Sequence, residues 1–319
     1  GSAPHHGDRT TADMFTADGE EVAIASRKSG ILHPQPGWTE FDMHTVWTNA
    51  AESIREVLEK SAVDPADIAC VACTGHGNGL YLVDADGQPV RNAISSSDSR
   101  AREYIDQWSA AGVDKMIRPK TMQAIWPAQP NALIRWLRDH EPAALQQARW
   151  ILMCKDYIRA QLTGEIYMER TDMSGTSLMN VGTGQYDDEV LAAWDLSDIR
   201  RMLPPLRDSA DLCGTITPAA AAACGLAEGT PVAGGMFDID ACGLSSAMTD
   251  STALCMIGGT WGNNQYIADA PVVSEDVFMT SCYSIPGYYL MLEGSATSAS
   301  NLEWFITQLM QAERSALAE

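Results

Sequence analysis

The first part of the chain switches from a strand pattern to a helix pattern. Residues 10–28 form two short apolar stretches on either side of Asp18-Gly19, and Asp-Gly between such stretches is typical of a hairpin turn. Over residues 42–60 apolar side chains recur at every fourth position, at Val46, Ala50, Ile54 and Leu58, which predicts an amphipathic helix. We therefore expect an initial hairpin with a helix packed on it.

Two apolar runs and a long helical region follow. Residues 68–74 are suited to a strand buried on both faces, and residues 80–83 to a second strand closed by an Asp-Gly turn. Between residues 98 and 201 helices are predicted over 100–111, 131–140, 142–148 and 155–162. The pattern indicates an α/β domain that carries a helical insertion.

The last third of the chain alternates strands and helices again. A helix is expected over 218–224, a strand over 231–233, a helix over 239–248, strands over 252–257 and 288–293, and a helix over 298–310. We assign residues 1–245 to a first domain and residues 246–319 to the start of a second domain.

Charge and length exclude several classes of function. The 42 acidic and 21 basic residues give a formal net charge of −21, which opposes association with a phosphate backbone and argues against general nucleic-acid binding. Apolar runs fall short of the roughly 20 residues that cross a bilayer. The N-terminus lacks the basic start and apolar stretch of a secretory signal. We expect no membrane partner and a cytoplasmic location.

The eight cysteines do not form a metal-binding or disulfide pattern. Only Cys70 and Cys73 form a CxxC pair, and neither a second pair nor a histidine at ligand spacing accompanies it. Because the pair falls within the apolar run at 68–74, a buried strand in which the thiols act as small hydrophobic groups is the simpler alternative to redox or metal use.

Two polar segments follow predicted strands in the first domain. Gly75-His76-Gly77-Asn78-Gly79 comes directly after the run at 68–74, where open α/β sheets expose ligand sites, and its spacing matches neither a dinucleotide fingerprint nor a P-loop. A plain tight turn is the alternative. Asp98 and Arg100 pair a carboxylate with a guanidinium that can hold polyol hydroxyls, unless Asp98 caps the following helix.

Two further segments have the residue types needed for phosphoryl transfer. Asp238 lies between a predicted strand and helix, where a carboxylate in a cleft can take a proton from an attacking hydroxyl; helix capping is the alternative. Gly258, Gly259 and Thr260 follow a strand and offer backbone N–H groups and a hydroxyl to an anion. Taken with Asp98, these features indicate phosphoryl transfer to a polyol.

Several short segments occur in an order shared with a known family. They are Pro36-Gly37-Trp38, Gly75-His76-Gly77, Asp98-Ser99-Arg100, Lys155-Asp156-Tyr157, Leu162-Thr163-Gly164 and Gly235-Met236-Phe237-Asp238. Through them the chain resembles the FGGY carbohydrate kinases over nearly its whole length. Asn92-Ala93-Ile94, Arg135-Trp136-Leu137 and Asn301-Leu302-Glu303-Trp304-Phe305 are most similar to the L-xylulose kinase branch, and the autoinducer-2 kinases are more distant.

The resemblance implies an actin-like ATPase architecture, in which two ribonuclease H-like domains flank a cleft. The first domain would bind the sugar and the second, largely, ATP. Asp238 would be the base that deprotonates a sugar hydroxyl as the γ-phosphoryl group arrives, and Gly258, Gly259 and Thr260 match the second phosphate loop. The segments that line the sugar pocket in the family carry His76, Gly77, Asn78, Asp98 and Arg100.

The remaining expectations also rest on the resemblance. Trp126 is a candidate to stack on the sugar, unless it fills the helical layer. The first phosphate loop falls on residues 4–8, where Asp8 is the candidate to help hold Mg²⁺. In the family, most of the adenosine pocket comes after the segments that residues 1–319 resemble. An inactive sugar-binding or actin-like interaction fragment is therefore the alternative to an ATP-dependent ketose kinase.

The substrate is the part of this interpretation that the sequence defines least. L-xylulose or 3-keto-L-gulonate is the first expectation by resemblance, with D-xylulose and L-ribulose next, and autoinducer-2 as a further alternative. Family members often form homodimers, so a homodimer is expected on the same ground.

Overall fold

The N-terminal hairpin and the first helix confirm the sequence pattern. In the computed structural model, which describes residues 9–258, 262–295 and 298–310, β1 (Arg9–Phe15) pairs antiparallel with β2 (Glu21–Lys28). Gly19 has a φ of 85° in the turn between them, a conformation that glycine adopts without steric cost. Helix α1 (Met43–Ser61) starts where Asp42 accepts hydrogen bonds from the N–H groups of His44 and Thr45.

Two parallel contacts join distant parts of the first domain. β5 (Thr74–Gly75) pairs with β15 (Met236–Phe237), and Val71 bridges Val232 in β14 (Pro231–Ala233). The other short strands pair as β3 (Ile31–Leu32) with β4 (Glu40–Phe41) and β7 (Ala93–Ile94), β6 (Tyr81–Val83) with β8 (Trp150–Leu152), β9 (Met168–Glu169) with β12 (Leu206–Arg207), β10 (Met179–Asn180) with β11 (Gln185–Tyr186), and β13 (Leu212–Thr215) with β14.

The prediction of a buried strand over residues 68–74 is wrong. Cys70 and Thr74 are exposed, and Val71 and Cys73 are only partly buried. Among the described residues, this segment pairs on one edge only, with β14 and β15. The other side of the segment is therefore left accessible to water. Cys70 and Cys73 are free thiols, which leaves the CxxC pair as part of a half-exposed segment.

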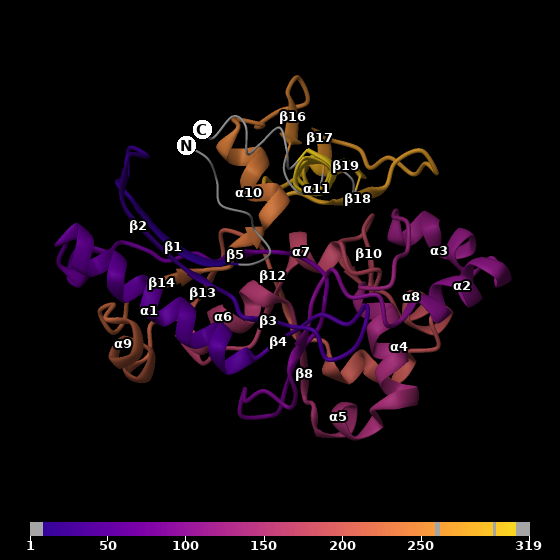
Figure 1. The fold of residues 1–319 in the computed structure, drawn as a ribbon, viewed down its shortest axis with the longest axis horizontal. Helices are drawn as coiled ribbons and strands as arrows, with labels where there is room; N and C mark the ends of the chain where they lie inside the picture. The colour runs from indigo at the N-terminus through magenta and orange to yellow at the C-terminus, as the bar shows by residue number, and fades with distance from the viewer. Residues whose placement is uncertain (1–8, 259–261, 296–297, 311–319) are drawn as a thin grey trace.

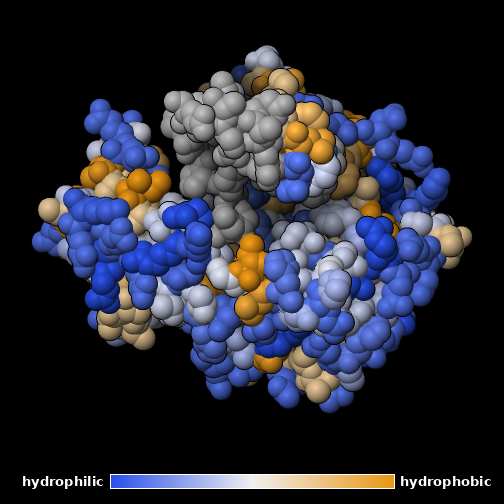
Figure 2. All heavy atoms as spheres, in the orientation of Figure 1, coloured by the Kyte–Doolittle hydropathy of each residue, from blue (hydrophilic) through white to orange (hydrophobic). Residues whose placement is uncertain are grey.

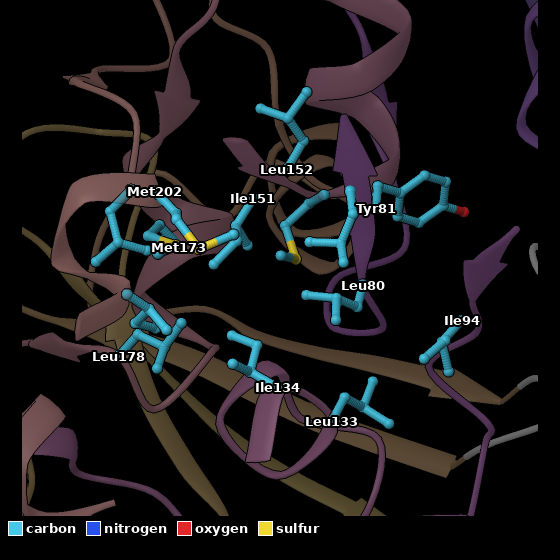
Figure 3. Packing of buried hydrophobic residues seen from close by; sticks show 14 of the residues in the cluster. Leu80, Tyr81, Ile94, Leu133, Ile134, Ile151, Leu152, Met173, Leu178 and Met202 are labelled. Atoms are coloured by element: carbon cyan, nitrogen blue, oxygen red, sulfur yellow. The ribbon is translucent and has the colours of Figure 1, made fainter. Parts of the chain in front are cut away.

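A helical region fills the middle of the chain, as predicted. Its helices are α2 (Arg102–Ala111), α3 (Val113–Thr121), α4 (Pro130–His140), α5 (Pro142–Gln147), α6 (Cys154–Thr163), α7 (Arg170–Ser174), α8 (Asp188–Ala193) and the 3₁₀ helix η2 (Ser197–Met202). Leu133 and Ile134 of α4 pack with Leu80, Ile151 and other buried residues in the largest core of the molecule (Figure 3). The sequence pattern missed α3, α7 and α8.

The smaller helices close the opposite end of the first domain. Helix α9 (Pro218–Cys224) contacts α1 and shares a second core with it, which includes Ala51, Leu58, Ala220 and Cys224. The 3₁₀ helix η1 (Pro65–Asp67) follows α1. Figure 1 shows α1 and α9 at one end of the molecule and α2 to α5 at the other.

The last described part of the chain builds a separate sheet. Helix α10 (Asp238–Ser245) leads to a four-stranded antiparallel sheet in the order β16 (Leu254–Gly258), β17 (Gly262–Ala268), β19 (Tyr289–Ser295) and β18 (Met279–Cys282). Helix α11 (Ala299–Leu309) follows. This sheet lies above the first domain in Figure 1 and has its own core around Met248, Ile267 and Leu290. The domain boundary at residue 245 stays a prediction.

The described surface is largely hydrophilic on the face shown in Figure 2. Apolar patches lie between the hydrophilic side chains. In the part of the chain that the structure describes, none of the helices combines the length and the apolar character needed to cross a membrane.

Removal of the α1 cap should destabilise the first domain. Asp42→Ala leaves two N–H groups of the first turn without their acceptor, so we expect the free energy of unfolding to fall by about 1 kcal/mol. Urea unfolding followed by circular dichroism measures the change. Asp42→Asn keeps a capping oxygen and should remain near wild type; an equal loss in both variants would contradict the capping role.

Candidate functional site

Parallel pairing places the loop after β5 beside the residue that follows β15. Thr74 pairs with Met236 and Gly75 with Phe237, so His76 and Asp238 leave their strands at the same edge. Gly235 has a φ of 79°, and a Cβ there would lie 2.0 Å from the Cys73 carbonyl oxygen. Only glycine permits this approach. The structure therefore brings together His76 and Asp238, two of the residues singled out in the sequence.

Asp238 is the first residue of α10 and is partly exposed. Its side chain does not cap the helix, because the N-cap position belongs to Phe237 and makes no side-chain cap hydrogen bond. Limited contact with water raises the pKa of Asp238 to about 6, while the charge of His76 and the N–H groups of Ile239 and Asp238 itself lower it. A carboxyl with this pKa is largely ionised at neutral pH and still accepts a proton readily.

The backbone between Gly77 and Gly79 is packed closely against its neighbours. A Cβ at Gly77 would lie 2.4 Å from the Phe237 ring and 2.9 Å from Asp172 Oδ1, and one at Gly79 would lie 2.4 Å from the Ile94 carbonyl oxygen. Asn78 is buried with a φ of 62°, and its Oδ1 has no hydrogen-bond partner among the described residues. This oxygen is available to a hydroxyl group.

Asp98 and Arg100 form a buried ion pair in which both carboxylate oxygens accept hydrogen bonds, while Arg100 Nη1 has no partner among the described residues. Arg100 Nε and Nη2 lie 2.9 Å from Asp98 Oδ1 and Oδ2, and the Thr39 N–H donates to Oδ2 at 2.6 Å. Arg100 also reaches Glu40 Oε1 at 2.9 Å and stacks on Trp38. The capping alternative for Asp98 is wrong, because α2 begins at Arg102 with Ala101 as its N-cap. Both side chains are buried. Their contact with a sugar stays a prediction.

Trp126 and Gly258 lie at or beside the second sheet. The Trp126 ring packs on Phe278, with ring centroids 5.2 Å apart, which places it where the helical region meets β18. Gly258 ends β16, and a Cβ there would meet nothing within 4 Å. Gly259, Thr260 and Asp8 lie outside the described residues. Among the described residues, no group of three or more metal-ligating side chains is arranged to hold a metal ion.

The sequence reasoning missed a buried ionic cluster next to this loop. The cluster comprises five side chains with no exposed surface: Lys155, Asp156, Arg159, Glu169 and Asp172. Lys155 Nζ lies 2.9 Å from Asp156, 3.4 Å from Glu169 and 3.5 Å from Asp172. The only signal in the sequence was the Lys155-Asp156 pair, because the other carboxylates come from separate elements.

The ionic cluster is linked to the strand that carries Asp238. Glu169 accepts hydrogen bonds from the backbone and the hydroxyl of Thr171, and Thr171 Oγ1 accepts one from the Phe237 N–H at 3.0 Å. Burial raises the pKa of Asp172 well above its usual range, although Lys155 lowers it. The cluster therefore forms a rigid support beneath β15 and the Gly77 loop.

Comparison with known proteins identifies the family of this chain. The family model described as the FGGY family of carbohydrate kinases, N-terminal domain, matches residues 7–244. The chain belongs to this family. As the resemblance implied, its α/β fold is that of the FGGY kinases, an actin-like ATPase fold with a helical insertion and the start of a second domain.

Two curated relatives are similar over most of this chain. A probable L-xylulose kinase of Pasteurella multocida is 36% identical over 301 residues, 93% of this chain and 62% of that protein. The L-xylulose/3-keto-L-gulonate kinase of Escherichia coli is 35% identical over 298 residues, 93% of this chain and 60% of that protein. The chain thus spans less than two thirds of the length of either relative.

Solved structures show the same fold at lower identity. The xylulose kinase from Rhodospirillum rubrum superimposes with a TM-score of 0.89 at 24% identity, over 98% of this chain and 63% of that one. The Plasmodium falciparum glycerol kinase with ADP gives a TM-score of 0.85 at 19% identity, over 94% of this chain and 61% of that one.

Loss of the buried pair should cost stability. Asp98→Ala leaves the buried Arg100 guanidinium without its bidentate partner, so we expect the free energy of unfolding to fall by about 3 to 5 kcal/mol. Chemical denaturation measures it. Glu275→Ala, which breaks the exposed Lys115–Glu275 pair, is the matched control and should cost less than about 1 kcal/mol. If Asp98→Ala were as stable as this control, the structural role would be wrong.

Proposed function

We propose that the protein phosphorylates a ketose with ATP and that Asp238 is the general base. The observation that carries the proposal is the register of β5 against β15, which puts Asp238 and its pKa of about 6 beside the His76 loop. Family membership and the names of the two similar kinases support the same reaction class.

The roles of the individual groups follow from their positions. The Asp238 carboxylate accepts the proton of the attacking sugar hydroxyl as that oxygen bonds to the γ-phosphorus and the bond to ADP breaks. His76 follows β5 at the edge where Asp238 follows β15 and is proposed to line the sugar pocket. The Oδ1 of the buried Asn78, which has no partner among the described residues, is proposed to accept from a sugar hydroxyl. Gly77 contributes by its lack of a side chain, which lets Phe237 pack against the loop.

Asp98, Arg100 and Trp126 are proposed to shape the pocket from its edges. The buried Asp98–Arg100 pair anchors the segment that follows Ile94, whose carbonyl oxygen closely approaches Gly79. The partly buried Trp126 ring offers an apolar face at the border with the second sheet.

ATP is the proposed phosphoryl donor, and its phosphates would lie near the end of β16. Gly258 fits this role because the space around its Cα is open, and backbone N–H groups of such a turn suit an anion. Gly259 and Thr260 are proposed to continue the phosphate loop. A divalent metal would neutralise phosphate charge, and Asp8 is the residue proposed to help hold it.

L-xylulose or 3-keto-L-gulonate is the proposed substrate, on the names of the relatives at 35% and 36% identity. D-xylulose, L-ribulose and autoinducer-2 are the competing substrates. The second candidate function is a sugar-binding or actin-like interaction module without ATP turnover, since the buried Asn78 Oδ1 can hold a sugar hydroxyl without any nucleotide.

Titration of ketoses and nucleotides separates the two candidates. Ketose-dependent ADP formation by the protein encoded by the complete gene, with one ketose preferred, supports the kinase. Calorimetry that detects ketose binding without any nucleotide binding or ADP formation supports the sugar-binding module instead. Absence of ketose binding contradicts both.

Neutralisation of the proposed base should abolish turnover while sugar affinity is kept. For Asp238→Asn we expect kcat to fall by about 10² to 10⁴-fold because the amide cannot accept the proton. Coupled ADP release measures kcat, and calorimetry measures ketose affinity. Asp240→Asn is the matched control: burial raises the pKa of Asp240 well above its usual range, so an amide replaces a neutral carboxyl. Unchanged kcat in Asp238→Asn would remove Asp238 as base.

The acid limb of the pH profile should report the same carboxyl. The pKa of Asp238 is raised to about 6, so the base is ionised above that pH and lost below it. We expect kcat/KM to be level above pH 6 and to fall about tenfold for each pH unit below it. A profile that stays level down to pH 4.5 would show that another group, or none, acts as the base.

A further inference from the structure

Tyr81 connects the interior of the first domain to the site through a single hydrogen bond. Its Oη lies 3.1 Å from His76 Nε2, while its ring has no exposed surface and stacks on Tyr157 with ring centroids 6.2 Å apart. Figure 3 shows the ring at the margin of the aliphatic core, with the oxygen directed away from Leu80 and Leu152.

The position of Tyr81 is fixed by backbone structure. It is the first residue of β6, and it pairs with Leu152 of β8. Burial raises the pKa of Tyr81 well above its usual range, so the phenol keeps its hydrogen at all physiological pH values. A fixed neutral hydroxyl is therefore held against one ring nitrogen of His76.

We propose that Tyr81 is a positioning residue that holds the His76 imidazole at the strand edge where Asp238 follows β15. This inference rests on the proposed function for its catalytic meaning, but the geometry itself does not depend on turnover. Without the bond from Tyr81, the remaining hydrogen-bond neighbour of the His76 ring among the described residues is the Gly77 carbonyl oxygen, 3.4 Å from Nδ1. That contact alone is too long to fix the ring.

A third group joins this chain of contacts. Cys154 is within hydrogen-bonding reach of Tyr81, and burial raises the pKa of its thiol to about 11, so it also keeps its hydrogen. The Tyr81 hydroxyl thus lies between a neutral thiol and the His76 ring.

The field at Asp238 comes from several elements, and His76 is the group that Tyr81 controls. The other titratable groups near Asp238 are Cys154 in α6, Asp172 in α7, and Asp240 and Cys242 in α10. Burial raises the pKa of each of these four groups. The charge of His76 lowers the pKa of Asp238, whereas the burial of Asp238 raises it. Displacement of the His76 ring should therefore raise the pKa of Asp238.

Nuclear magnetic resonance of the ligand-free chain tests the proposal directly. Long-range ¹H–¹⁵N spectra, with His76 assigned by the signal missing in His76→Gln, should show the His76 ring ¹⁵N signals displaced in Tyr81→Phe. Carboxyl ¹³C titration, with Asp238 assigned by Asp238→Asn, should show its midpoint in Tyr81→Phe raised by about half a pH unit, a threefold gain in proton affinity. In the His76→Gln background Tyr81→Phe should cause no further shift.

Tyr157→Phe is the matched control. It removes another buried phenol from the same aromatic stack, one that bonds the Met43 carbonyl oxygen at 3.1 Å and not His76, so the Asp238 midpoint should stay at its wild-type value. An unshifted midpoint in Tyr81→Phe, or an equal shift in Tyr157→Phe, overturns the proposal. If Tyr81→Phe fails to fold, an Asp238 midpoint that is the same in His76→Gln as in the wild type overturns it as well.

The same variants separate this proposal from the proposed function. In an active kinase the acid limb of kcat/KM in Tyr81→Phe should move to higher pH by the same amount as the carboxyl titration. If the titration moves and no ketose is phosphorylated, the positioning role holds and the kinase assignment fails. If the acid limb stays fixed while turnover persists, the positioning role fails and the assignment holds.

Discussion

The site depends on the close approach of two backbone segments, the end of β5 and the turn before β15. Gly235 makes this approach possible, because any Cβ at that position would overlap the Cys73 carbonyl group. Gly77 allows the second close contact, between the loop and the Phe237 ring. A side chain at either position would move apart the strands that carry His76 and Asp238. These two glycines thus serve backbone packing, which differs from the ligand contact expected for the Gly75–Gly79 loop.

Burial has opposite consequences at the centre of the site and beneath it. Below the loop, Lys155 and Arg159 are paired with carboxylates at distances down to 2.7 Å, which offsets part of the large cost of removing charges from water. Within the described part of the chain Asp238 has no such partner, and burial raises its pKa to about 6. A paired carboxylate would be a weak base, whereas Asp238 combines ionisation at neutral pH with useful proton affinity.

Local patterns in the sequence predicted the hairpin, α1, α4 and α6, because these elements are determined by turn residues, caps and apolar periodicity. The same reasoning selected the loop after β5 and Asp238 from their places after strands. It failed for residues 68–74, since an apolar run does not reveal how many neighbours a strand has. It also missed Tyr81 and Asp172, whose importance depends on contacts between segments far apart in the chain.

Helix α10 links the site to the second sheet. Its first residue, Asp238, follows directly from β15, which is tied to the ionic cluster through Thr171. The same first turn is held by β17 and by the segment after β18: Gln265 Nε2 donates to the Ile239 carbonyl oxygen at 2.7 Å, and the Ser284 N–H donates to Asp240 at 2.9 Å. Asp238 is thus anchored from both sides. Any displacement of the sheet relative to the first domain must act on α10, and so on the distance between Asp238 and the His76 loop.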